Sequence, residues 1–306
     1  MSHELTIRPN NFAEMAYKGE RAWHGLGQCV PAGATIDDWI SLAGMDWRIQ
    51  RSRLRYAVSG KGPLLIDEKR HMLFRSDTHT PLSVVSSGYK VVQPADTLKF
   101  FQSLIDTHGY ELETAGTLFG GKKFWALART NQSVDLSGDK LENYLLLSTS
   151  CDGSSATEAR FTSVRVVCNN TLSIASGGEA AYRVTHASEF DADAVKASLA
   201  SEYFTSFADR VEQLISKPLS NDQAEAFFNE LTTPSKAKDM FKLFTGVGAG
   251  SDLITAKQTA WGALNAVTEY VDHSGIGRTP NGKINNQFFG TGEKLKKEAM
   301  SLLLDE

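Results

Sequence analysis

Hydrophobic and polar positions alternate with a period of two through much of the first 170 residues, as in β-strands with one buried face. The clearest run begins at Trp47, and Gly, Asp, Thr and Pro residues separate it from shorter runs. Gly120-Gly121 lies between two of these runs and suits the positive φ angles of a tight hairpin turn. Strands are predicted at 47–58, 63–66, 71–75, 82–86, 89–93, 110–118, 122–129, 143–149 and 160–168.

A helical period appears at three places in this half. Thr35 is a predicted N-cap with Asp38 at the third helical position, and Gly44 is a stop signal. The segment 94–105 places its leucines and phenylalanines on one side, and Gly109 ends it. A third helix is expected to begin near Asn169 or Asn170.

Beyond residue 187 the pattern is helical throughout. The spacing predicts helices at 188–216, 224–231, after Pro234, at 251–273 and at 293–304, with a capping box from Ser220 to Gln223. The fold class expected is α+β: an antiparallel β-sheet with packed helices in the N-terminal half, and a helical C-terminal half. We divide the chain into a β-rich domain with a basic strand, 1–187, and a helical region, 188–306.

Composition fits a globular protein, since 41% of the 306 residues are hydrophobic and 22% are charged. No apolar run reaches the ~18–20 residues that span a bilayer, and the N-terminus has no signal-peptide core. We therefore expect a cytoplasmic protein that does not enter membranes. Cys29, Cys151 and Cys168 form no Cys-x-x-Cys motif, so neither a disulfide framework nor a zinc site is expected.

Charge is distributed unevenly, although the net charge is only −4. Residues 48–75 contain eight lysines and arginines but only two acidic residues, Asp67 and Glu68. Three of the arginines share one face of the first strand about 6.6 Å apart, and arginine forks suit phosphate oxygens. Alternatively, these arginines pair with the acidic helical half or with a partner subunit. The candidate nucleic-acid-binding residues are Arg51, Arg53, Arg55, Lys61, Lys69, Arg70, Lys122, Lys123, Arg160 and Arg165.

Two other features are candidates for chemistry. Trp23 and His24 lie in a glycine-flanked segment that is a candidate functional loop, with a structural histidine as the alternative. Glu111 and Glu113 share a strand face, and Asp67 stands near Lys69, which keeps a metal-dependent nuclease open. The seven histidines contain no i, i+4 pair of the kind that binds metal on a helix, so no metal site is assigned.

Several segments together resemble the phage/plasmid-like protein family, a domain-of-unknown-function family of prophages, phages and plasmids. The resemblance implies a mobile-element origin but no residue roles. The chain departs from the family pattern at Cys151, where a histidine is expected. The similar stretches are Ala22-Trp-His-Gly-Leu-Gly27, Val164-Arg-Val-Val-Cys-Asn-Asn-Thr-Leu172, Arg183-Val-Thr-His186, the segment 259–273 and the segment 288–296.

The element order around residues 82–129 is also loosely similar to that of phage single-strand annealing proteins, an analogy at the level of fold. That similarity implies a basic groove for DNA, an oligomeric ring and no cofactor. We therefore expect a nucleic-acid-binding protein of a mobile element that promotes single-strand DNA annealing or recombination as a homo-oligomer. The alternatives are a metal-dependent nuclease and a protein-binding module, such as an inhibitor of host defence.

Overall fold

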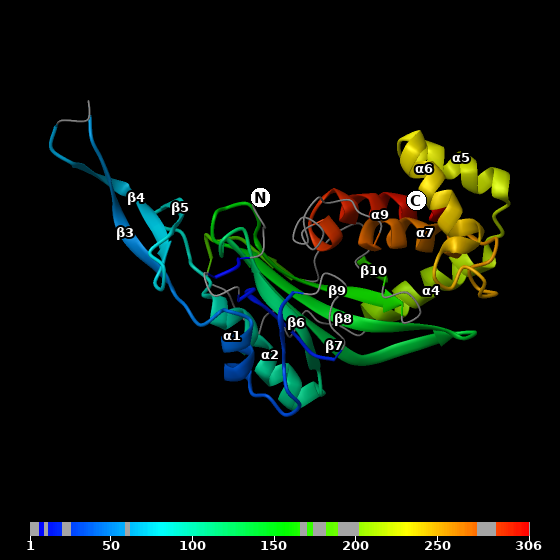
Figure 1. Cartoon of the computed structure of the whole chain (residues 1–306), viewed down its shortest axis with the longest axis horizontal. Coiled ribbons are helices and arrows are strands. Elements are labelled where there is room, and N and C mark those ends of the chain that lie inside the picture. Colours follow the sequence, from blue (N-terminus) through cyan, green and yellow to red (C-terminus); the bar gives the residue numbers. More distant parts are fainter. Residues whose placement is uncertain are drawn as a thin grey trace. The chain divides into compact units, whose positions relative to one another are not determined.

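The computed structural model describes residues 6–8, 12–19, 26–58, 62–165, 170–173, 182–188, 202–273 and 286–305. Its strands pair mostly antiparallel and its helices lie mainly in the C-terminal half, which confirms the α+β class (Figure 1). Packing divides the chain into two compact units. Unit 1 comprises Met1–Arg129, Leu145–Ala159 and Ala181–Leu199, and unit 2 comprises Thr130–Tyr144, Arg160–Ala180 and Ala200–Glu306. Each unit is thus built from separate segments, whereas the sequence suggested one boundary at residue 187, which stays a prediction.

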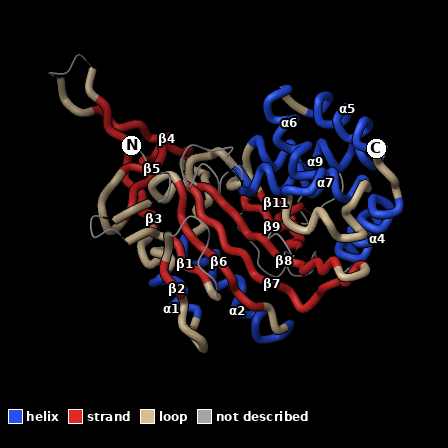
Figure 2. Tube along the Cα trace, turned by 45° about the vertical axis from the view of Figure 1, so that its right-hand side comes forward, coloured by secondary structure: helices blue, strands red, loops and turns tan. Residues whose placement is uncertain are grey.

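The larger sheet has the strand order β10-β9-β8-β7-β6-β1-β2, with β11 paired to β9 (Figure 2). Within it, β1 and β2 run parallel. β6 pairs antiparallel with both β1 and β7, and β9 pairs antiparallel with both β10 and β11. The strands are β1 Met15–Tyr17, β2 Gln28–Cys29, β6 Glu111–Leu118, β7 Lys123–Leu136, β8 Asp139–Ser150, β9 Thr157–Arg165, β10 Asn170–Ser173 and β11 Tyr182–Val184.

A second sheet in unit 1 has three antiparallel strands in the order β3-β4-β5. They are β3 Ile49–Tyr56, β4 Leu65–Arg75 and β5 Pro81–Ser86. β5 pairs only with residues 70–74 of β4, so β3 and β4 continue past it as a two-stranded ribbon (Figure 1). We call β3 and β4 together the arm.

One continuous strand replaces the two that were predicted at 63–66 and 71–75. The register shifts between Arg53, which lies opposite His71, and Leu54, which lies opposite Asp67. Three residues of β4 are therefore accommodated as an irregularity of the ladder. Residues 68–70, between the two predicted strands, therefore form a bulge within one strand and not a turn.

A buried ion pair holds the base of the arm. Arg75, at the end of β4, donates from Nη2 to Glu14 Oε1 at 2.6 Å, and both side chains are almost fully buried. The guanidinium lies 4.0 Å from the ring centre of Trp47, and Thr117 Oγ1 donates to Glu14 Oε2. Burial alone would lower the pKa of Arg75, but hydrogen bonds to Asp77 and Glu14 raise it. The arm thus starts from a rigid point of unit 1.

The helices of unit 1 follow their capping signals. Thr35 and Asp38 form the expected capping box of α1, Ile36–Leu42. α2, Pro94–His108, ends at Gly109 in the left-handed conformation, as predicted. The strand predicted at 89–93 is wrong, because that backbone is a loop in which the Lys90 amide donates to the His186 carbonyl and Gln93 precedes α2.

The described helices of unit 2 are α4 Glu202–Ser216, α5 Asn221–Leu231, α6 Pro234–Lys242, a π-helical turn Leu243–Val247, α7 Ala260–His273 and α9 Thr291–Leu304. The capping box at Ser220 is confirmed. The helix expected from Asn170 is wrong, because Asn170–Ser173 pairs with β9. No helix among these described residues is long and apolar enough to cross a membrane.

Two buried polar clusters lie inside unit 2. The Asp139 carboxylate accepts hydrogen bonds from Trp261 Nε1 at 2.9 Å and Thr255 Oγ1 at 3.2 Å. Lys296 is fully buried and donates to Asp272 at 3.1 Å. These bonds tie the segment Thr130–Tyr144 to α7, and α7 to α9. A buried charge that lost its partner would be costly, so both clusters are structural elements of this unit.

Candidate functional site

The three arginines of β3 form an exposed row of cations. Arg51, Arg53 and Arg55 are all exposed. Within the part of the chain that the structure describes, neither Arg53 nor Arg55 forms an ion pair or a side-chain hydrogen bond. An unpaired guanidinium at the surface keeps its five donors available for an anion.

β3 is also an edge strand among the described strands, where β4 is its only partner. The Gln93 side chain forms hydrogen bonds with both backbone polar groups of Ile49. It accepts from the N–H at 2.8 Å and donates to the carbonyl at 3.2 Å. In an antiparallel ladder, backbone groups alternate between facing the partner strand and facing outward. The backbone groups of Arg51 and Arg53 therefore face outward like those of Ile49.

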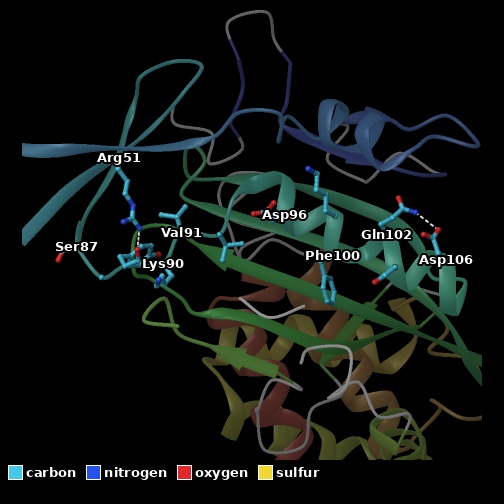
Figure 3. A pocket seen from close by; sticks show the side chains of 13 residues that line it. Arg51, Ser87, Lys90, Val91, Asp96, Phe100, Gln102 and Asp106 are labelled. Carbon is cyan, nitrogen blue, oxygen red and sulfur yellow. Dashed lines mark hydrogen bonds between the residues drawn. The ribbon is translucent and has the colours of Figure 1, made fainter. Parts of the chain in front are cut away.

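A pocket of about 900 Å³ opens at the base of the arm (Figure 3). Arg51 lines one end, and its Nη2 donates to the Tyr89 carbonyl. Helix α2 supplies the opposite wall, where Gln102 donates to Asp106 at 2.8 Å. The lining cations are Arg51, Lys90 and Lys99, and the lining carboxylates are Asp96 and Asp106. Arg51 therefore connects the row of arginines to a concave polar surface.

The α2 side of this pocket was not predicted from sequence. The sequence alone suggested no role for Lys99, Gln102 or Asp106 of α2. Their spacing of three and four residues could have indicated a common polar face, but only the fold places that face opposite Arg51.

The remaining predicted cations have different surroundings. Lys69 and Arg70 are exposed on β4, with Arg70 Nε 3.9 Å from Asp67. Lys122 is half-buried. Lys123 is buried at 8% exposure, which corrects its expected place in an open groove; the hairpin at Gly120-Gly121 turns it into the covered start of β7.

Arg160 belongs to unit 2, where its side chain is 12% exposed and lies 3.9 Å from Glu293. Its guanidinium is also 5.5 Å from the ring centre of Phe289. Arg160 is therefore packed within its own unit, and its role in nucleic-acid binding stays a prediction. Lys61, Trp23 and His24, and the side chain of Arg165, lie outside the described residues.

The carboxylates of the nuclease hypothesis are engaged by cations. Glu111 accepts from Lys18 and Arg129, each at 3.0 Å, and these bonds lower its pKa. Glu113 lies 3.4 Å from Arg129. Asp67 accepts from the Lys69 amide at 2.9 Å. Among the described residues, no three or more His, Cys, Asp or Glu side chains gather in a way that could hold a metal.

Cys151 is a buried thiol beside Asp152. Burial, together with the Asp152 charge, raises its pKa to about 12. Its carbonyl accepts a hydrogen bond from Ser83 Oγ at 2.6 Å, and its sulfur lies 3.6 Å from the Gly121 carbonyl. A thiol held in this state is a poor nucleophile at neutral pH.

The fold and these surfaces define an α+β protein with an exposed basic β-ribbon next to a polar pocket. More particularly, the chain belongs to the family described as "Domain of unknown function (DUF932)", whose model matches residues 81–288. The arm precedes the matched region, whereas most of the pocket lies within it. No curated protein matches the chain. The solved structures likewise contain no match.

Proposed function

We propose that this protein binds nucleic acid along the arm and promotes single-strand DNA annealing or recombination. The observation that carries the proposal is the row of exposed arginines on β3, two of which have no partner among the described residues. Alternate residues of a strand lie about 6.6 Å apart, close to the spacing of successive phosphates along an extended nucleic-acid strand.

The pocket supports the same ligand. Arg51 belongs to both surfaces, so a phosphate chain that follows β3 would arrive at a pocket that also carries Lys90 and Lys99. Gln102 and Ser103 add neutral polar groups that suit base edges or sugar hydroxyls. The mechanism is binding alone: neutralised phosphates allow the strand to extend and leave its bases free to pair.

The biological setting is part of this proposal. The resemblance to phage and plasmid proteins favours a mobile genetic element acting in the cytoplasm, and annealing by known phage proteins suggests a homo-oligomer. No cofactor enters the mechanism.

The test is binding of labelled single- and double-stranded DNA across a salt series, followed by addition of the complementary strand. We expect steep salt dependence and faster annealing. Arg53→Ala with Arg55→Ala should reduce the slope of log K against log salt by roughly 1.4 to 1.8, because each neutralised phosphate contributes about 0.7 to 0.9. Both side chains are exposed and form no ion pair or side-chain hydrogen bond with a described residue, so the variant should fold normally.

The matched control is Lys238→Ala with Lys294→Ala, which removes two exposed lysines of unit 2. This control should leave the slope unchanged. Absence of binding near ~50 mM salt would refute the proposal. Co-purification of a host protein without any DNA binding would instead favour the protein-binding module.

A further inference from the structure

Exposed apolar side chains gather at the far end of the arm. Of the eleven large hydrophobic residues that are exposed in the described chain, five lie in this short stretch, with exposed fractions from 38% to 61%. Scattered exposed residues need no explanation, but a contiguous group marks an interaction site. We call this group the apolar end; it comprises Tyr56, Val58, Leu64, Leu65 and Ile66.

The register places the three strand residues of the apolar end on both faces of the ribbon. Tyr56 lies opposite Leu65, whereas Ile66 lies opposite Arg55. Directly opposite residues point to the same face and neighbours along a strand point to opposite faces. Since β5 does not extend to this part of β4, no third strand among the described residues shields it. The apolar end therefore combines apolar side chains on two faces with a guanidinium beside Ile66.

Charge decides between the occupants of such a surface. A second copy would bring another row of β3 arginines against the first, and like charges oppose that pairing. Nucleic acid offers the complement of this surface: phosphates for the arginines, and apolar base faces between them. Leucine and isoleucine side chains can separate base steps as wedges, and a tyrosine ring can stack on a base.

We infer that the apolar end inserts between the bases of a nucleic acid that the β3 arginines hold, and so unstacks them. This inference rests on the proposed function for the identity of the ligand. It adds a separate role: the arginines supply the phosphate contacts, while Tyr56, Leu65 and Ile66 disturb the stacking of bases. Unstacked bases on a held strand are those a complementary strand can reach.

The experiment uses DNA that carries the fluorescent base 2-aminopurine, whose emission rises when the base leaves the stack. Leu65→Ser with Ile66→Ser removes the wedge from an exposed site, and Val247→Ser with Ile254→Ser is the matched control, since those residues are 76% and 80% exposed in unit 2. We expect the full-length wild type and the control to raise the emission severalfold on binding. The arm variant should lose most of that rise while keeping its salt slope, because no cation is removed.

An arm variant that binds and still unstacks the probe base would overturn the inference and leave the proposed function standing. A wild-type protein that binds DNA without any rise in emission would do the same. Binding to vesicles of phosphatidylserine and phosphatidylcholine that depends on Leu65 and Ile66, without DNA binding, would overturn both and assign the surface to membranes.

Discussion

Two arginines of the same ribbon have opposite roles. Arg75 is buried against Glu14 and Trp47, whereas the Arg53 side chain is exposed and forms no ion pair or hydrogen bond with a described residue. The first secures the base of the arm, and the second is available to an anion. On this ribbon, solvent exposure and the absence of a described partner therefore distinguish a guanidinium that is available to an anion from a structural one.

The cysteines allow a prediction about chemistry at single residues. Cys151 is buried and its pKa is about 12, so almost none of it is thiolate at pH 8. Cys29 is exposed. We expect iodoacetamide at pH 8 to modify Cys29 in the native protein while Cys151 stays unmodified, with peptide mass spectrometry as the measurement.

Denaturant provides the control for this prediction, because unfolding should make Cys151 react as Cys29 does. Replacing Asp152 with Asn should leave Cys151 protected, since burial is the larger cause of its raised pKa. Rapid alkylation of Cys151 in the native state would show that the loop opens.

At the scale of the element, the β6–β7 hairpin is fitted to the base of the arm. Gly120 and Gly121 both have positive φ, at 70° and 92°. A Cβ on Gly121 would lie 2.6 Å from the Trp47 ring, whereas one on Gly120 would meet nothing within 4 Å. The Trp47 ring has little freedom to move, because its Nε1 donates to the Gly44 carbonyl at 3.0 Å.

These two glycines form a matched pair for mutation. Gly120→Ala should cost about 1–2 kcal/mol, from left-handed backbone strain alone. Gly121→Ala should cost about 1–3 kcal/mol more, because overpacking against Trp47 is added to the same strain. Urea denaturation measures both changes, and equal losses would mean that the hairpin does not press on the arm base.

Helix ends were predicted correctly where the sequence carried a full capping box or a glycine stop. The capping boxes at Thr35 and Ser220 and the Gly109 stop were all found as expected. The helix predicted at 251–273 starts late, because Gln258 adopts a positive φ and Thr259 Oγ1 accepts from the Gly262 amide at 3.1 Å. Thr259 is thus the cap, a signal that apolar periodicity concealed.

Only the part of the candidate site that depends on local sequence periodicity was predicted. Period-two spacing found the β3 arginines, since a strand face is a local property. It did not find that Lys123 is buried, that Arg160 packs in unit 2, or that α2 forms the far wall of the pocket. Each of those depends on packing between segments distant in sequence.

At the scale of the whole molecule, the two units interleave along the chain. Asp139 lies before residue 187, and its buried partners Thr255 and Trp261 lie after it. A fragment ending at residue 187 would leave this carboxylate without both partners. The division at 187 that the sequence suggested is therefore expected to cut through the core of unit 2.

Fragment 1–187 should lack a cooperative unfolding transition and tend to aggregate, whereas the full chain should unfold cooperatively. Circular dichroism during urea denaturation measures the difference. Co-expression with 188–306 should restore soluble material if the partners of Asp139 are what is missing. A monomeric 1–187 that unfolds cooperatively would support the boundary at 187 instead.

The arm begins and ends at one place within unit 1, since Ile49 lies opposite Arg75 at its base. Such a ribbon can gain or lose residues in pairs without rerouting any other element, and each added pair lengthens it by about 3.4 Å. Its reach is therefore adjustable independently of the pocket. Because the arm precedes the region matched by the family model, relatives built on the same framework could carry arms of different length, which under the proposed function would span nucleic-acid sites of different size.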